Sequence, residues 1–221
     1  THGLQKDTTI ALVFEPDRAP GLYRDHFPVV WKVFTFRSQG HPKKTIHYTP
    51  RLAFAYSQVD QDNLVESVAW VEARVNSFRV YIRRRALISG QNDDSGELNL
   101  AGVNQADLDY FVCRNGSNSH ANLSIGLLKG DKHHQHYEPV CLWTGVRSNS
   151  EIATHFTPKV SVYVTRKYKV NERLPSEVET DAIWSQNLDE LDDVSSWNLV
   201  ERPDTGKFSI EPARNWPNRY L

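Results

Sequence analysis

Three side chains in a short histidine-rich stretch have the chemistry of a metal site. His134, His136 and Glu138 alternate along the chain, so an extended segment would point all three the same way. Two imidazoles and a carboxylate are common ligands of zinc and other transition metals. A histidine-rich tract is more often a solvated loop. A metal-dependent enzyme built around His134 and His136 is therefore an alternative function, and no other pattern points to a cofactor.

Arginine and tyrosine alternate along a second segment. In a strand, one face would carry Arg79, Tyr81, Arg83 and Arg85, and apolar side chains would fill the other face. A cationic and aromatic face of this kind can hold a phosphate, a sulfate or a lipid head group through charge-assisted hydrogen bonds and ring contacts. Alternatively, this segment is a solvated edge strand whose charges discourage pairing with a strand of another molecule.

Aromatic residues offer a third kind of site. The chain has 6 Trp, 9 Tyr and 9 Phe, and exposed aromatic rings can stack on sugars or hold a cationic head group. Trp70 and Trp184 each end a similar acidic and apolar stretch. We therefore add Trp70 and Trp184 to the four residues of the arginine segment as candidate ligand-binding residues.

Signatures of covalent catalysis are missing. The chain has no Gly-x-Ser-x-Gly elbow and no phosphate-cradling glycine-rich loop, and neither Cys113 nor Cys141 has a neighbouring histidine. Whether the two cysteines pair stays open, as does the processing that left Thr1 first. These observations favour a non-catalytic protein.

A short sequence motif that occurs twice indicates the strands that would position these residues. His47–Leu52 (HYTPRL) reappears as His155–Val160 (HFTPKV), with a tryptophan-bearing apolar segment before each copy and an acidic, tryptophan-ended stretch after it. Large and small side chains alternate after each Thr-Pro, as in a strand with one buried face. The sequence therefore predicts an internally duplicated strand motif.

Many short strands separated by turns favour a mainly-β fold, a β-sandwich. We expect one compact domain over residues 1–221, with pseudo-repeat halves of about 1–102 and 103–221. One short helix is expected near 177–191, because Ser176 and Glu179 match a capping box.

Charge and hydropathy limit the classes of partner that the sequence predicts. The 26 Lys and Arg balance 27 Asp and Glu, which argues against a nucleic-acid partner. No apolar run reaches the roughly 20 residues of a transmembrane helix. The cytoplasm is favoured, with secretion as the alternative, and the oligomeric state is left open.

Together these features predict a non-catalytic, lectin-like recognition protein. Its partner would be a membrane lipid head group or a glycan, bound through exposed aromatic and arginine side chains. A structural or storage protein is a further alternative.

Overall fold

Strands dominate the chain. The structure is a computed structural model that describes residues 1, 3–15, 26–40, 42–73, 79–82, 111–131, 134–174 and 181–213, with the backbone alone for 79–82. Within these ranges the helical content is one 3-10 turn, η1 (Leu188–Glu190). The prediction of a mainly-β fold is confirmed.

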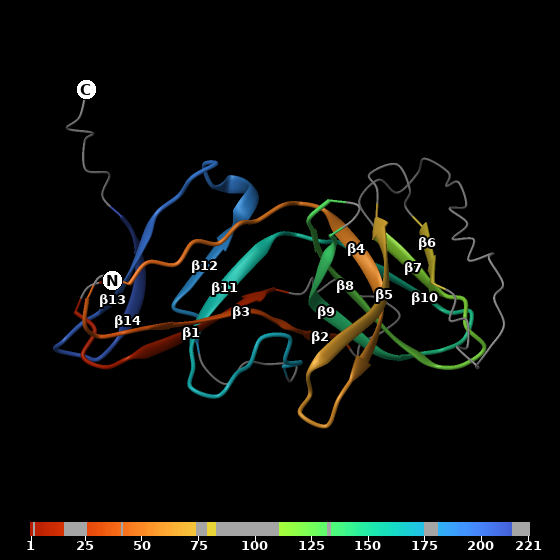
Figure 1. The fold of residues 1–221 in the computed structure, drawn as a ribbon, viewed down its shortest axis with the longest axis horizontal. Helices are drawn as coiled ribbons and strands as arrows, with labels where there is room; N and C mark the ends of the chain where they lie inside the picture. Colours follow the sequence, from red (N-terminus) through yellow and green to blue (C-terminus); the bar gives the residue numbers. More distant parts are fainter. Residues whose placement is uncertain are drawn as a thin grey trace.

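Two larger antiparallel sheets form the body (Figure 1). The four-stranded sheet has the order β12-β11-β1-β3, and its strands are β1 (Thr8–Phe14), β3 (Val30–Phe36), β11 (Lys159–Val164) and β12 (Trp184–Asn187). The five-stranded sheet has the order β2-β9-β8-β4-β5, and its strands are β2 (His26–Pro28), β4 (Leu52–Val59), β5 (Val65–Ala73), β8 (Ala121–Lys129) and β9 (His136–Val146).

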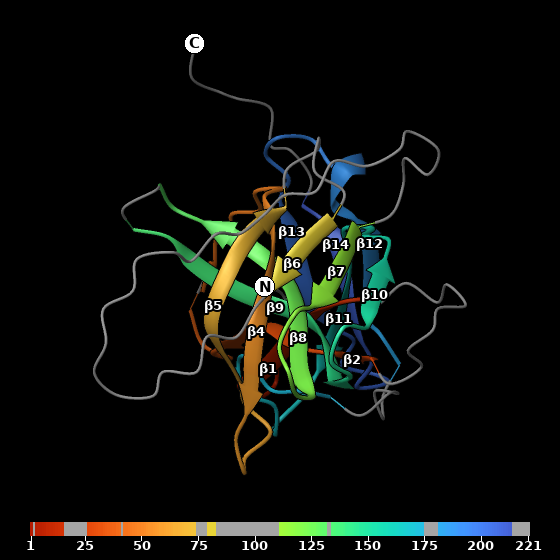
Figure 2. The same ribbon diagram turned by 90° about the vertical axis from the view of Figure 1, so that its right-hand side faces the viewer.

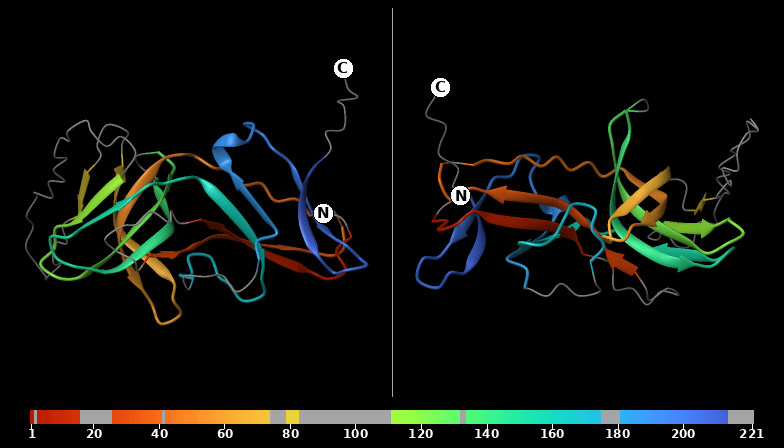
Figure 3. Two further views of the ribbon diagram at one scale, coloured as in Figure 1. Left: turned by 180° about the vertical axis from the view of Figure 1, so that it is seen from behind. Right: turned by 60° about the horizontal axis from the view of Figure 1, so that its bottom comes forward.

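Two smaller sheets lie at the ends of the molecule (Figures 2 and 3). A three-stranded sheet, in the order β10-β7-β6, consists of β6 (Arg79–Ile82), β7 (Phe111–Asn115) and β10 (Glu151–Thr154). A two-stranded sheet pairs β13 (Trp197–Glu201) with β14 (Phe208–Pro212).

One apolar cluster joins all four sheets. It includes Phe14 of β1, Phe54 of β4, Cys113 of β7 and Leu199 of β13. Phe54 and Cys113 have no exposed surface. Because alternate residues of a strand face opposite sides, each sheet turns one apolar face to this core.

The two larger sheets repeat one arrangement of strands. Read from β12, the first sheet is β12-β11-β1-β3, and read from β5, the second begins β5-β4-β8-β9. Strands β1, β3, β4 and β5 therefore correspond to β8, β9, β11 and β12. Each set of four places two strands in one sheet and two in the other, so the two halves of the chain exchange strand pairs.

The register of the corresponding strands also agrees. In β4, Leu52 pairs with Leu127 of β8, and in β11 the matching Val160 pairs with Phe14 of β1. The residue after each Thr-Pro proline donates its amide hydrogen to the threonine carbonyl, at 2.8 Å in the first copy and 2.7 Å in the second. This agreement supports the predicted repeat, although the duplication of the sequence itself stays a prediction.

Two connections carry the exchanged strands across the middle of the molecule (Figure 1). One joins β3 to β4 and the other joins β10 to β11. The aromatic residues at matching positions of the connections, Tyr48 and Phe156, both lie against Phe14, with ring centroids at 6.4 Å and 5.5 Å. Burial, with a smaller effect of Asp189, raises the pKa of Tyr48 to about 12. The connections are thus anchored in the shared core.

The tryptophans before the two Thr-Pro motifs do not correspond. Trp31 lies at a β-bulge of β3, between the partners of Leu12 and Val13. The matching bulge in β9 places Val140 at this position, and the counterpart of Trp143 is Phe34. The two tryptophans occur at similar spacings in the sequence but at different positions of the pleat.

The predicted helix near 177–191 is wrong where the structure describes it. Residues 184–187 form β12, which pairs with β11 through Val162 and Trp184, and a 3-10 turn follows. The capping-box pattern is a local signal, whereas β12 satisfies the edge of β11 and buries part of Trp184 in the core. Residues 177–180 lie outside the described part of the chain.

Candidate functional site

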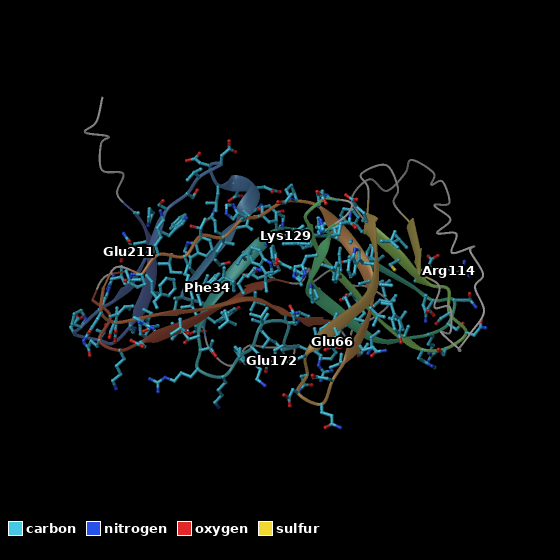
Figure 4. The ribbon with its side chains drawn as sticks, viewed as in Figure 1. Phe34, Glu66, Arg114, Lys129, Glu172 and Glu211 are labelled. Carbon is cyan, nitrogen blue, oxygen red and sulfur yellow. The ribbon has the colours of Figure 1, made fainter. Side chains whose placement is uncertain are left out.

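The carboxylate of the predicted metal site is already bound by donors from the protein. Glu138 is 7% exposed on the core-facing side of β9. Its Oε2 accepts hydrogen bonds from Trp31 Nε1 at 2.6 Å and Lys129 Nζ at 3.0 Å, and its Oε1 accepts one from Lys32 Nζ at 2.6 Å. Lys129 lies near the middle of the molecule (Figure 4).

The two predicted histidine ligands do not complete a metal site. His136 has 72% of its side chain exposed, and its Nε2 lies 3.9 Å from Glu138 Oε1. His134 is exposed and precedes β9, in a turn where its amide donates to Asp131. No group of three His, Cys, Asp or Glu side chains within the described ranges is placed to hold a metal ion. The geometry gives the metal-dependent alternative no support.

Glu138 instead ties strands of both larger sheets together. Burial alone would raise the pKa of Glu138, but the hydrogen bonds from Lys32, Trp31 and Lys129 outweigh burial and lower it. Both lysine ammonium groups also lie over the Trp31 ring, at 5.6 Å and 5.5 Å from its centroid. This compact group of charges stabilises the junction of the sheets.

The arginine segment is described in part. Arg79 and Tyr81 lie in β6, which pairs in parallel with β7, so the predicted strand is confirmed over Arg79–Ile82. The structure describes the backbone of these two residues and not their side chains. Arg83 and Arg85 lie outside the described residues. Binding by this segment stays a prediction.

The two candidate tryptophans have different environments. Trp184 packs edge-on against Trp197, with ring centroids 5.3 Å apart and an interplanar angle of 69°. This contact joins the β13–β14 hairpin to the four-stranded sheet, and Trp184 is partly buried against the main core. Trp70 lies on the outer face of the five-stranded sheet, the face turned away from the main core. Its cross-strand partner Ala55 is on that face as well.

Trp70 is half-buried and stacks on a buried tyrosine. Its ring lies nearly parallel to that of Tyr137, at an interplanar angle of 11° and a centroid distance of 6.0 Å. Tyr137 is 5% exposed and packs with Ala53, Ala55 and Leu128 on the outer face of the five-stranded sheet. The stack places a partly exposed indole on a rigid support.

Small residues make room for this support. Ala53 and Ala55 have no exposed surface on the same face, and a Cβ at Gly126 would lie 2.6 Å from Cζ of Tyr137. Glycine inside a strand often marks such a close approach. That signal, together with the small alternate residues of β4, could have located the site from the sequence.

A chain of hydrogen-bonded hydroxyl groups holds the Tyr137 hydroxyl in place. The Tyr137 hydroxyl lies 2.9 Å from Ser124 Oγ, which lies 2.7 Å from Ser57 Oγ, which lies 3.2 Å from Ser67 Oγ. Burial, as the main cause, raises the pKa of Tyr137 well above its usual range. The phenol therefore stays protonated and donates or accepts within this chain.

An ion pair borders the stack. Arg51 donates through Nε to Glu72 Oε1 at 3.0 Å and through Nη2 to Glu72 Oε2 at 3.2 Å. Glu72 is two residues after Trp70 on β5, so both side chains project from one face of the sheet. We call the set Trp70, Tyr137, Arg51 and Glu72 the aromatic platform.

The cysteines offer no reactive thiolate. Cys113 and Cys141 are both buried free thiols. Burial raises the pKa of Cys141 to about 12 and that of Cys113 further. A thiol of this kind is a poor nucleophile at neutral pH.

Comparison of this chain with protein-family models, with curated proteins and with solved structures finds no match. Within the described ranges, none of the helical structure is long and apolar enough to span a membrane. The site is therefore judged on its own geometry.

Proposed function

We propose that the chain is a non-catalytic recognition protein that binds a glycan at the aromatic platform. The observation that supports this most is the partly exposed Trp70, which stacks at 11° on the buried Tyr137. The Tyr137 hydroxyl is in turn hydrogen-bonded to Ser124. A ring held in place before the ligand arrives loses little conformational entropy on binding, so more of the contact energy appears as affinity.

The chemistry of the platform suits a sugar. The face of an aromatic ring is electron-rich and attracts the weakly positive C–H groups of one side of a pyranose. The Arg51–Glu72 pair adds hydrogen-bond donors and acceptors on the same face, since Glu72 lies two residues after Trp70 on β5, and these groups suit sugar hydroxyl groups. An apolar stacking surface beside a few fixed polar groups is typical of small-ligand sites.

A lipid head group is the other partner that the sequence suggests. That interpretation depends on Arg79, Tyr81, Arg83 and Arg85, whose side chains the structure does not describe. A cationic head group such as choline is usually enclosed by several aromatic faces, whereas within the described ranges the ring that stacks on Trp70 is that of Tyr137. The described geometry therefore favours the glycan.

The test compares two variants of one strand. A glycan array probed with the full chain would select a ligand, and calorimetry would then measure its affinity. We expect Trp70→Ala to weaken binding by about tenfold or more, which corresponds to about 1.4 kcal/mol. Val68→Ala is the control, because Val68 is a 57% exposed apolar residue of the same strand. Equal affinity of Trp70→Ala and the unmodified chain, or binding to liposomes and to no glycan, would contradict the proposal.

A further inference from the structure

The outer face of the four-stranded sheet carries a group of polar side chains that bind one another. Glu15 Oε1 accepts hydrogen bonds from the hydroxyl groups of Ser161 and Ser185, the second at 2.8 Å. Its Oε2 binds Lys159 Nζ at 2.7 Å. Tyr163 lies two residues after Ser161 on β11, so its ring projects from the same face, where it is partly exposed. We call these five residues the tyrosine cluster.

The tyrosine cluster lies where the correspondence of the strands places the aromatic platform. Lys159 follows one Thr-Pro motif as Arg51 follows the other. The Lys159 carbonyl accepts the amide hydrogen of Glu15 at 2.9 Å, and the Arg51 carbonyl accepts that of Leu128 at 2.8 Å. The two basic residues therefore have matching places in their sheets.

The two sites combine the same kinds of group. In the platform the partner of the basic residue is Glu72 of β5, and in the cluster it is Glu15, directly after β1. The ring belongs to Trp70 in the platform and to Tyr163 in the cluster. Tyr163 has the position of Ala55, which is the cross-strand partner of Trp70. Each outer face thus places an aromatic ring and an ion pair next to a Thr-Pro motif.

The polar groups of the cluster lie close to the tyrosine hydroxyl. Burial raises the pKa of Tyr163, a hydrogen bond with Ser161 lowers it, and the negative charge of Glu15 raises it further. A carboxylate can accept about four hydrogen bonds, so Glu15 can take a sugar hydroxyl in addition to its three donors. These donors hold the carboxylate in place before a ligand arrives, which reduces the entropy lost on binding.

We infer that the tyrosine cluster is a second glycan-binding site, so that each chain holds two sugar units, one on each of the two larger sheets (Figure 1). The inference rests on the proposed function. A pyranose lies with its C–H groups against the Tyr163 ring and donates a hydroxyl hydrogen to Glu15. Two sites on one chain give higher avidity for a surface that carries many copies of the glycan than either site gives alone.

The experiment counts ligands per chain. The oligosaccharide selected on the glycan array is titrated into the full chain by calorimetry, which gives the number bound per chain in any oligomeric state. We expect two ligands in the unmodified chain and one in Tyr163→Ala, with the affinity of the platform changed by less than about twofold. Circular dichroism and the retained platform binding show that this variant is folded. A single ligand in the unmodified chain, lost in Trp70→Ala, would overturn the inference and leave the proposed function in place.

A milder variant tests the carboxylate. Glu15→Gln keeps the size of the side chain, and we expect it to weaken the second site by about tenfold while the platform is unaffected. Glu211→Gln removes the same charge from an exposed position of β14 and should retain both affinities. A second ligand that binds equally well to Glu15→Gln, Tyr163→Ala and the unmodified chain would also overturn the inference. Failure to bind any glycan in a Trp70-dependent way would remove the proposed function, and the inference with it.

Discussion

The outer faces of the two larger sheets differ, although their strands correspond. In the four-stranded sheet this face carries Ala11, Val13 and Val30, and Leu174 of the connection after β11 packs on them. The connection is held by backbone hydrogen bonds to Val30, from its amide to the Glu172 carbonyl at 2.9 Å and to its carbonyl from Asn171 at 2.9 Å. The connection after β11 therefore covers this part of the outer face.

In the five-stranded sheet the corresponding connection, between β4 and β5, is residues 60–64. It makes a tight turn in which Asn63 has a φ of 61°, and Trp70 and Tyr137 stack on each other on this sheet's outer face. One arrangement of strands thus supports two different outer faces. Among the described residues, the connection after β11 packs Leu174 on one outer face, and an aromatic pair occupies part of the other.

The largest expected effect concerns the shared core. Phe54→Ala should cost about 4 kcal/mol of unfolding free energy and the matching Val162→Ala about 2 kcal/mol, because each leaves a cavity. Both should shift one cooperative transition, since each strand inserts into the sheet of the other half. Urea unfolding followed by fluorescence and circular dichroism measures this. Separate transitions for the two sheets would show that the strand exchange does not couple them.

A second prediction contrasts Gly126 with its counterpart Val13. Gly126→Ala should destabilise the chain by about 3 kcal/mol, because the added Cβ would collide with the Glu138 carbonyl oxygen and would lie 2.6 Å from the Tyr137 ring. Val13→Ala removes two methyl groups from a site that already holds a side chain and should cost about 2 kcal/mol. Thermal unfolding compares the two. A neutral Gly126→Ala would contradict the close packing of Tyr137.

A third prediction concerns Glu138, whose counterpart in the other sheet is the apolar Val29. Glu138→Gln should cost about 2 kcal/mol at neutral pH, because Lys32 and Lys129 lose their counter-ion but stay partly solvated. The folded-state pKa of Glu138 is lowered. Its contribution is therefore complete above the ordinary carboxyl pKa of 4.5 and is lost as the pH falls through the lowered value.

The check is the difference in unfolding free energy between Glu138→Gln and the unmodified chain at neutral pH and at about pH 3. The difference should shrink at the lower pH. A constant difference would show that the charge of Glu138 is not what the variant removes.

The smallest effect is expected at Glu15, on the outer face of the four-stranded sheet. Its carboxylate binds Lys159 Nζ at 2.7 Å, but the two side chains are 36% and 46% exposed. Glu15→Gln should therefore change stability by about 0.5 kcal/mol, and less in high salt. Chemical denaturation at two salt concentrations measures it, and a loss as large as that of Glu138→Gln would contradict the distinction between the sites.

Strand positions were predictable from the sequence because side-chain alternation is local. Leu52 and Phe54 face the core, while Ala53 and Ala55 face the other side, as the pattern after Thr-Pro predicts. The exchange of strands was not predictable, because the connection before Tyr48 has no period that tells in which sheet it ends. The helix prediction failed because pairing with β11 outweighed a local capping signal.

The candidate site was predictable only in part. Trp70 was among the expected ligand-binding residues, but composition alone did not separate it from Trp184, which is partly buried between the main core and Trp197. Tyr137 adjoins the histidine tract, whose alternation drew attention to Glu138 on the opposite face of β9. What identifies the platform is cross-strand register, since β5 and β9 are brought to one face through β4 and β8.

The most direct test is fluorine NMR of the full chain with its 6 tryptophans labelled. The Trp70 signal would be assigned with Trp70→Phe, and the oligosaccharide that binds best on the glycan array would be titrated in. The account predicts that the Trp70 resonance moves in step with binding while those of Trp31, Trp143 and Trp184 stay in place. A stationary Trp70 resonance in the saturated complex would contradict it.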